Sequence, residues 1–202
     1  MRWRNALGGL AAMLVLGACA VSAPPIQHFQ LSHGAPPAAT TDSPVIMLEA
    51  VRLPDFLLRE ELLLRDDEYS LRYDPTQRWA EPLDLGIQRV IARRLESRLN
   101  TRQVSLFPQV PHGAAADWRL TVTVDHLERD GNNALIAAEG RWARTSDDEI
   151  VAVVTFSETS ALSGIDGDEI AAALSELLWR FADALAEALP RDAGTDFSPD
   201  PN

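Results

Sequence analysis

The sequence predicts one α+β domain in which two long amphipathic helices pack on one face of a mainly antiparallel or mixed β-sheet. Apolar and polar residues alternate from residue 118 to 124, which is typical of a strand with one buried face. Two other stretches repeat their apolar residues every three or four positions, as amphipathic helices do. Because the 202 residues include one Cys, no intramolecular disulfide can form, and the hydrophobic core must stabilise the domain.

Short strands are predicted in the part of the chain that precedes the first helix. Residues 26–31 form an extended candidate between segments rich in Ala, Pro, Ser and Thr. Residues 45–51 are an apolar run with β-branched residues that ends before Pro54, and they predict a buried strand. Residues 62–65 and 69–73 flank three acidic residues and predict a small hairpin.

An amphipathic helix is predicted over residues 82–100. Pro82 suits the first turn of a helix, where its missing N–H removes no hydrogen bond. The opposite face is basic, and two interpretations remain open: it faces solvent, or it contacts a partner or lipid headgroups. The apolar face comprises Leu83, Ile87, Val90, Ile91, Leu95 and Leu99, and the basic face comprises Arg89, Arg93, Arg94 and Arg98.

A strand near residues 103–107 and then an antiparallel meander are expected to follow this helix. Turn signals at Asp130–Asn133 and at Asp147-Asp148 divide the apolar alternation into three segments. Each segment is long enough to pair with its neighbour through a short connection. The three expected strands cover residues 118–124, 134–144 and 150–156.

The closing helix is predicted to begin near Asp168 and to reach Leu189, with Pro190 ending it. The acidic residues 166–169 resemble a calcium loop in composition, but the later glycine and the terminal glutamate of an EF-hand are missing. They are better explained as a helix start, where acids complement the helix dipole. The apolar stripe consists of Ile170, Leu174, Leu177, Leu178, Phe181 and Leu185.

The amino-terminal segment has the layout of a bacterial lipoprotein leader. Residues 1–18 combine a positive start, an apolar stretch and small residues, and the sequence Leu16-Gly17-Ala18-Cys19 resembles a lipobox. Lipidation of Cys19 is therefore expected, the alternative being an ordinary secretory leader that contains a Cys. In similar lipoproteins an Asp directly after the lipidated Cys is associated with retention in the inner membrane. This chain has Ala20 there, which favours the periplasmic face of the outer membrane.

These features divide the chain into four parts. After the signal peptide, residues 19–44 are expected to form the lipidated Cys and a linker with one early strand. Residues 45–190 form the α+β domain, and residues 191–202 a disordered tail. The apolar stretch of the leader is too short for a confident membrane span, which needs about 20 residues.

Composition and motif spacing disfavour several functions. The net charge is −12, and all 18 basic residues are Arg, so nucleic-acid binding and lysine chemistry are not expected. No metal-ligand spacing connects the four histidines, and no nucleophile motif is present, so we expect no metal, no cofactor and no enzymatic activity. The histidines are His28, His33, His112 and His126.

Two further motifs fit no catalytic pattern: Val51–Arg59, which reads VRLPDFLLR, and Arg78–Leu83, which reads RWAEPL. They resemble the PqiC-type, or YmbA-like, family of ABC-type transport auxiliary lipoproteins, whose members show an LPxxLxR element and then an RWAEPL segment before the first helix. The resemblance extends to about residue 190. The chain departs from the family at His28–Leu31, where a Tyr-Tyr-Thr-Leu-like strand is common, and it retains Tyr69 and Tyr73 of a tyrosine-rich hairpin.

The resemblance implies an accessory subunit that works with a PqiB-like periplasmic MCE-domain protein in lipid transport between membranes, with a ring-shaped homo-oligomer as a further expectation. A stand-alone structural or lipid-binding lipoprotein is the alternative. The residues expected to form a docking surface are Arg59, Arg78, Trp79 and Glu81, beside Pro82. The competing interpretation places Trp79 in the core and gives Arg78 and Glu81 a role in capping the helix.

Overall fold

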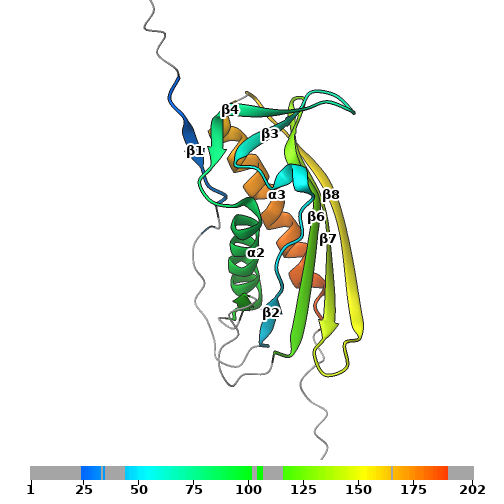
Figure 1. The fold of residues 1–202 in the computed structure, drawn as a ribbon. Helices are drawn as coiled ribbons and strands as arrows, with labels where there is room; N and C mark the ends of the chain where they lie inside the picture. Colours follow the sequence, from blue (N-terminus) through cyan, green and yellow to red (C-terminus); the bar gives the residue numbers. More distant parts are fainter. Residues whose placement is uncertain are drawn as a thin grey trace, which may run out of the picture.

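A long antiparallel meander forms the centre of the protein. The computed structural model describes residues 24–32, 34, 44–101, 104–106, 116–164 and 166–190. Two helices lie together on one face of the meander (Figure 1). The strands are β6 (Trp118–Asp130), β7 (Asn133–Arg144) and β8 (Ile150–Ala161), and the helices are α2 (Leu83–Leu99) and α3 (Gly167–Ala188).

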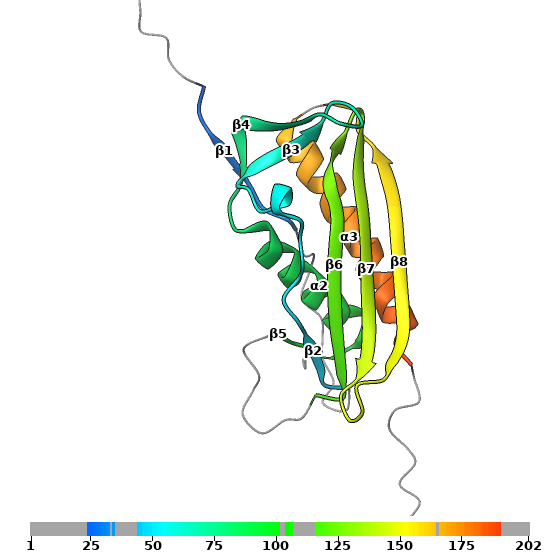
Figure 2. The ribbon, with the colours of Figure 1, turned by 45° about the vertical axis from the view of Figure 1, so that its right-hand side comes forward.

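Three separate segments lie along the edge of β6 that does not pair with β7. Strand β2 (Ile46–Leu48) pairs in parallel with its start, and Arg52 forms an isolated bridge to Thr123. Strand β3 (Glu61–Arg65) pairs in parallel with its end through Leu64 and Arg129. Figure 2 shows this succession along β6. The remaining strands extend the mixed eight-stranded sheet: β5 (Val104–Leu106) pairs with β2, β4 (Leu71–Trp79) with β3, and β1 (Gln27–Phe29) with β4.

The core lies between the meander and the two helices. Helix α3 approaches β7 so closely that a Cβ at Gly140 would lie 2.2 Å from Cδ2 of Leu185. The indole Nε1 of Trp142 donates to the carbonyl of Leu185 at 2.9 Å, which satisfies its one polar atom inside the core. A Cβ at residue 140 would therefore require Leu185 or α3 to move.

The predicted fold class is confirmed, and the element boundaries differ where local pattern was ambiguous. Strand β6 continues to Asp130 because a bulge between Val124 and His126 shifts the alternation without ending the strand. Strand β8 continues to Ala161, whereas β2 is limited to three residues. Strand β4 covers 71–79 instead of the expected 69–73, since the turn includes Tyr69.

The basic face of α2 was expected to face solvent or to contact a partner or lipid headgroups, and most of its arginines instead make contacts within the chain. Arg94 and Arg98 reach Asp183 on α3, and Arg98 also reaches Glu187. Arg89 donates to the carbonyl of Leu31 at 3.0 Å, next to β1. Most of this face therefore holds α2 to neighbouring elements.

Several expectations lie outside the described residues: the signal peptide, Cys19, most of the linker, the tail 191–202, His33 and His112. Strand β1, which was placed in the linker, pairs with β4 as part of the sheet. Among the described helices, none combines the length and the apolar character that a bilayer span requires.

Candidate functional site

The pairing of β3 with β4 brings the two sequence motifs together. The first motif leaves the edge of β6 at Arg52, whose N–H donates to the carbonyl of Val122 at 3.0 Å. It then forms a short 3-10 helix, η1 (Asp55–Leu57), and leads into β3. The second motif ends β4 and begins α2. The N–H of Trp79 donates to the carbonyl of Glu60 at 2.6 Å, so the two motifs adjoin.

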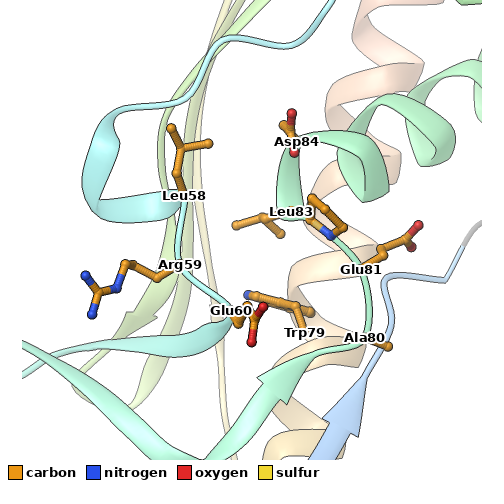
Figure 3. A pocket seen from close by; sticks show the side chains of 9 residues that line it. Leu58, Arg59, Glu60, Trp79, Ala80, Glu81, Leu83 and Asp84 are labelled. Atoms are coloured by element: carbon orange, nitrogen blue, oxygen red, sulfur yellow. The ribbon is translucent and has the colours of Figure 1, made fainter.

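A surface pocket of about 280 Å³ lies where the motifs meet. In Figure 3, Leu58 and Leu83 come from opposite walls, whereas the guanidinium of Arg59 points away from the pocket. The walls are mainly apolar, and Glu60, Glu81 and Asp84 supply carboxylates around them. The lining residues are Leu58, Arg59, Glu60, Trp79, Ala80, Glu81, Pro82, Leu83 and Asp84.

Trp79 and Arg78 have different environments although they are adjacent. Trp79 is 7% exposed and belongs to the hydrophobic core, and its side chain also contributes to the pocket wall. Arg78 reaches Glu60 and Glu61, each at 3.5 Å, and so links the end of β4 to the start of β3. These two residues position the pocket, and Trp79 presents part of its surface there.

Glu81 and Pro82 fix the path of the chain into α2. The carboxylate of Glu81 accepts hydrogen bonds from Gln30 at 3.1 Å and from Arg89, which ties this corner to the chain after β1. Pro82 occupies the N-cap position, and its own side chain supplies no capping hydrogen bond. Glu81 therefore ties α2 to the chain after β1 through Arg89, about two turns into the helix, and its role in capping stays a prediction.

Arg59 holds the turn that carries Leu58. Its guanidinium lies 5.1 Å from the ring centroid of Tyr73, close enough for a cation–π interaction. The hydroxyl of Tyr73 donates to the carbonyl of Phe56 at 3.2 Å, within η1. Leu58, which is 56% exposed, is thus presented on a segment fastened to β4.

A buried polar cluster beneath η1 was not predicted from the sequence. The carboxylate of Glu128 is fully buried and accepts two hydrogen bonds from Arg65, at 2.8 and 2.9 Å, and one from the N–H of Leu127. His126 Nδ1 lies 3.0 Å from the same carboxylate, and its ring lies near Phe56. The cluster supports the segment that forms one wall of the pocket. No local sequence pattern marks this cluster, because its members come together only through the pairing of β3 with β6.

The residues around the pocket combine apolar side chains with carboxylates. Throughout the described segments, no three His, Cys, Asp or Glu residues lie together as a metal site would require. His28 and His126 are the two described histidines, and neither lines the pocket. The pocket has apolar walls and a charged rim. These features are suited to hold a side chain of another molecule.

The fold and the pocket together define a class of small α+β domain with a surface pocket that two sequence motifs build. The chain belongs to the family of ABC-type transport auxiliary lipoprotein components, whose family model matches residues 29–186. This match covers both motifs, the meander and nearly all of α3. It confirms the family suggested by the motifs and supports a transport accessory role and membrane anchoring in the cell envelope. A comparison with curated proteins gives no match.

Solved structures that are similar to this chain include two with the same fold. A crystal structure of an uncharacterized protein has a TM-score of 0.67 at 18% identity, covering 81% of this chain and 98% of the other. A DUF330-family protein from Xanthomonas campestris also has a TM-score of 0.67, at 19% identity, covering 79% and 92%. Identities this low establish the likeness of fold alone.

Proposed function

We propose that this chain is a non-catalytic accessory subunit of an MCE-type, Pqi-like intermembrane lipid transport system that supports envelope integrity. It is anchored through Cys19 to the periplasmic face of the outer membrane and docks on an MCE-domain partner. The family description supports the accessory role. One observation carries the docking proposal: the two motifs, separated by 18 residues in the sequence, meet in a single surface pocket.

The pocket favours a protein side chain over a lipid as its occupant. Its volume of about 280 Å³ is slightly below the range of roughly 300–1,000 Å³ that is typical of small-molecule sites. Leu58, Trp79 and Leu83 offer an apolar surface, and Glu60 and Asp84 lie around it. A partner segment that presents an apolar side chain beside an Arg or Lys would satisfy both features.

Two exposed leucines provide a matched test of docking. Leu58 lines the pocket and is 56% exposed, whereas Leu85, on the first turn of α2, is 52% exposed and does not line it. The full-length lipoprotein would be purified from detergent-solubilised envelopes, and the co-purified MCE-domain protein quantified. We expect Leu58→Asp to lower that amount about tenfold or more, as loss of an interface anchor does, and Leu85→Asp to leave it unchanged.

The other outcomes separate the competing functions. Equal recovery of the partner with both variants would contradict docking at the pocket. If the unmodified protein brings down no MCE-domain protein, the transport role loses its support, and lipid bound to the purified protein would then favour a stand-alone lipid-binding lipoprotein. The expected ring of identical copies stays a prediction, which the mass of the detergent-solubilised protein tests.

A further inference from the structure

Strand β8 leaves one long edge of the sheet unpaired. It has 12 residues and pairs with β7 alone among the described strands. Figure 2 shows β8 as the outermost strand along the height of the meander. The other edge strands, β1 and β5, have three residues each. An unpaired edge of this length is a template for another strand.

The register shows which backbone groups face this edge. The N–H of Leu162 donates to the carbonyl of Asn132, so these two opposite residues form a hydrogen-bonded pair. Along an antiparallel ladder every second pair of opposite residues is bonded in this way. In β8 the even-numbered residues from Ala152 to Ser160 therefore bond to β7. The odd-numbered residues, from Val153 to Ala161, direct their N–H and C=O groups away from β7. A regular row of donors and acceptors results.

The side chains of β8 do little to block pairing. The strand contains no Pro, Lys or Arg, the residues with which proteins commonly protect a sheet edge. Its one charged side chain, Glu158, is paired with Arg180 of α3 at 3.2 Å. A bulge interrupts the ladder near Ala152, and the register is regular from there to Ala161. Ile150 and Val153 are 55% and 53% exposed, so the edge is also apolar at its start.

The edge favours a strand from a different protein as its occupant. The three-residue edges of β1 and β5 cannot match ten regular residues of β8 in a second copy. Antiparallel pairing of β8 with β8 of a second copy would place the two amino ends at opposite ends of the dimer. Four residues lie between Cys19 and Pro24, and the five Cα–Cα steps that join these two residues span at most about 18 Å. Copies that are anchored upright in one bilayer therefore disfavour that arrangement.

We propose that the free edge of β8 binds an extended, uncharged and β-branched segment of a partner protein by β-strand addition. Its apolar side chains pack beside Val154 and Phe156 on the face toward α3, and its Thr or Ser side chains lie beside Thr155 and Ser157 on the outer face. The inference rests on the proposed function, because it names a second contact of this subunit with its transport partner.

Photo-crosslinking in intact envelopes tests the proposal on the full-length protein. p-Benzoylphenylalanine would replace Val153 or Ser157 at the edge, and Arg141 on the outer face of β7 as the matched control. We expect adducts from the two edge positions, mapped by mass spectrometry to one short segment of the co-purifying partner, and none from the control. Thr155→Pro removes an edge N–H without touching the ladder to β7, and should reduce the adduct about fivefold to tenfold, whereas Thr155→Ala should not.

Val153→Lys provides a second variant that needs no backbone change, and it should lower the adduct in the same way. An adduct that joins two copies, or two parts of one copy, would overturn the proposal by identifying a different occupant. The proposal also fails if the MCE-domain partner co-purifies normally but no adduct forms at the edge, a result that leaves docking at the pocket intact. Absence of any co-purifying partner would instead count against the proposed function itself.

Discussion

Arg94 on α2 and Asp183 on α3 form a bidentate ion pair, with Nε 2.7 Å from Oδ1 and Nη2 2.8 Å from Oδ2. The hydrogen bonding that Arg94 donates to the Asp183 carboxylate raises the pKa of Arg94 above its usual value. Because the pair is partly buried and joins the two helices, it contributes to the geometry of the helical layer as well as to its stability.

Replacing Arg94 tests this contribution. Arg94→Lys keeps the charge but loses the planar fork that matches the carboxylate, so we expect the free energy of unfolding to fall by about 0.5–1.5 kcal/mol. Arg93→Lys is the matched control, since Arg93 is more exposed and pairs with Glu96 within its own helix; a loss below about 0.5 kcal/mol is expected. Urea titration followed by circular dichroism measures both, and equal losses would contradict the prediction.

The close approach of α3 to β7 predicts an asymmetry between two glycines. Gly140→Ala would place a Cβ 2.2 Å from Leu185 and should lower the free energy of unfolding by about 1–3 kcal/mol. Gly86→Ala meets no atom closer than 3.4 Å and should raise it by up to about 1 kcal/mol, because alanine favours the helix. Thermal melting of the two variants measures the difference. A tolerated alanine at residue 140 would show that α3 can shift.

The β3–β4 turn should respond to acid. The hydrogen bond from Arg72 lowers the pKa of Asp66, and the one from the N–H of Tyr69 lowers the pKa of Asp67, both below the ordinary value of 3.8. A carboxylate whose pKa is lowered by folding stabilises the folded turn at pH values above its ordinary pKa. This contribution is lost as the pH falls through the lowered pKa.

The Tyr69 amide reports this change directly. Its NMR shift should stay constant from pH 7 to about 5 and change only below about 4. Asp67→Asn retains an acceptor oxygen without a titrating group, so the transition at Tyr69 should disappear in that variant. A midpoint above 4 would contradict the lowered pKa of Asp67.

Cys19→Ser tests the membrane anchor. A hydroxyl does not replace the thiol in lipid attachment, so we expect the variant to move from the envelope pellet to the soluble periplasmic fraction. Ser22→Ala, three residues away, should leave the protein in the pellet. Complete sedimentation of Cys19→Ser with the envelopes would refute the proposed attachment.

Periodicity was sufficient to predict both helices and the meander, because each spans several repeats of its pattern. It failed at the bulge after Val124, where one extra residue moves the following side chains to the opposite face. The burial of Glu128 therefore could not be anticipated, since its partner Arg65 lies on β3 and meets it only in the folded sheet.

The pocket shows a similar division. The two motifs pointed to five site residues, of which Arg59, Trp79, Glu81 and Pro82 line one pocket and Arg78 does not. Their meeting depends on the pairing of β3 with β4, and the register of a hairpin with a long turn is not specified by its local pattern. Leu58, Glu60, Leu83 and Asp84 were missed because single apolar or acidic residues carry no distinctive signal.

The parallel pairing of β2 with β6 also constrains the order of folding. During synthesis from the amino end, Ile46 and Leu48 emerge some 70 residues before Trp118 and Leu120, the neighbours that they pair with. Such distant contacts slow folding, and the waiting segment exposes apolar side chains in the meantime. A nascent chain that stops before residue 118 therefore offers β2 only the three-residue strand β5 as a native neighbour, and a chaperone has its best opportunity to bind β2 before β6 has been synthesised.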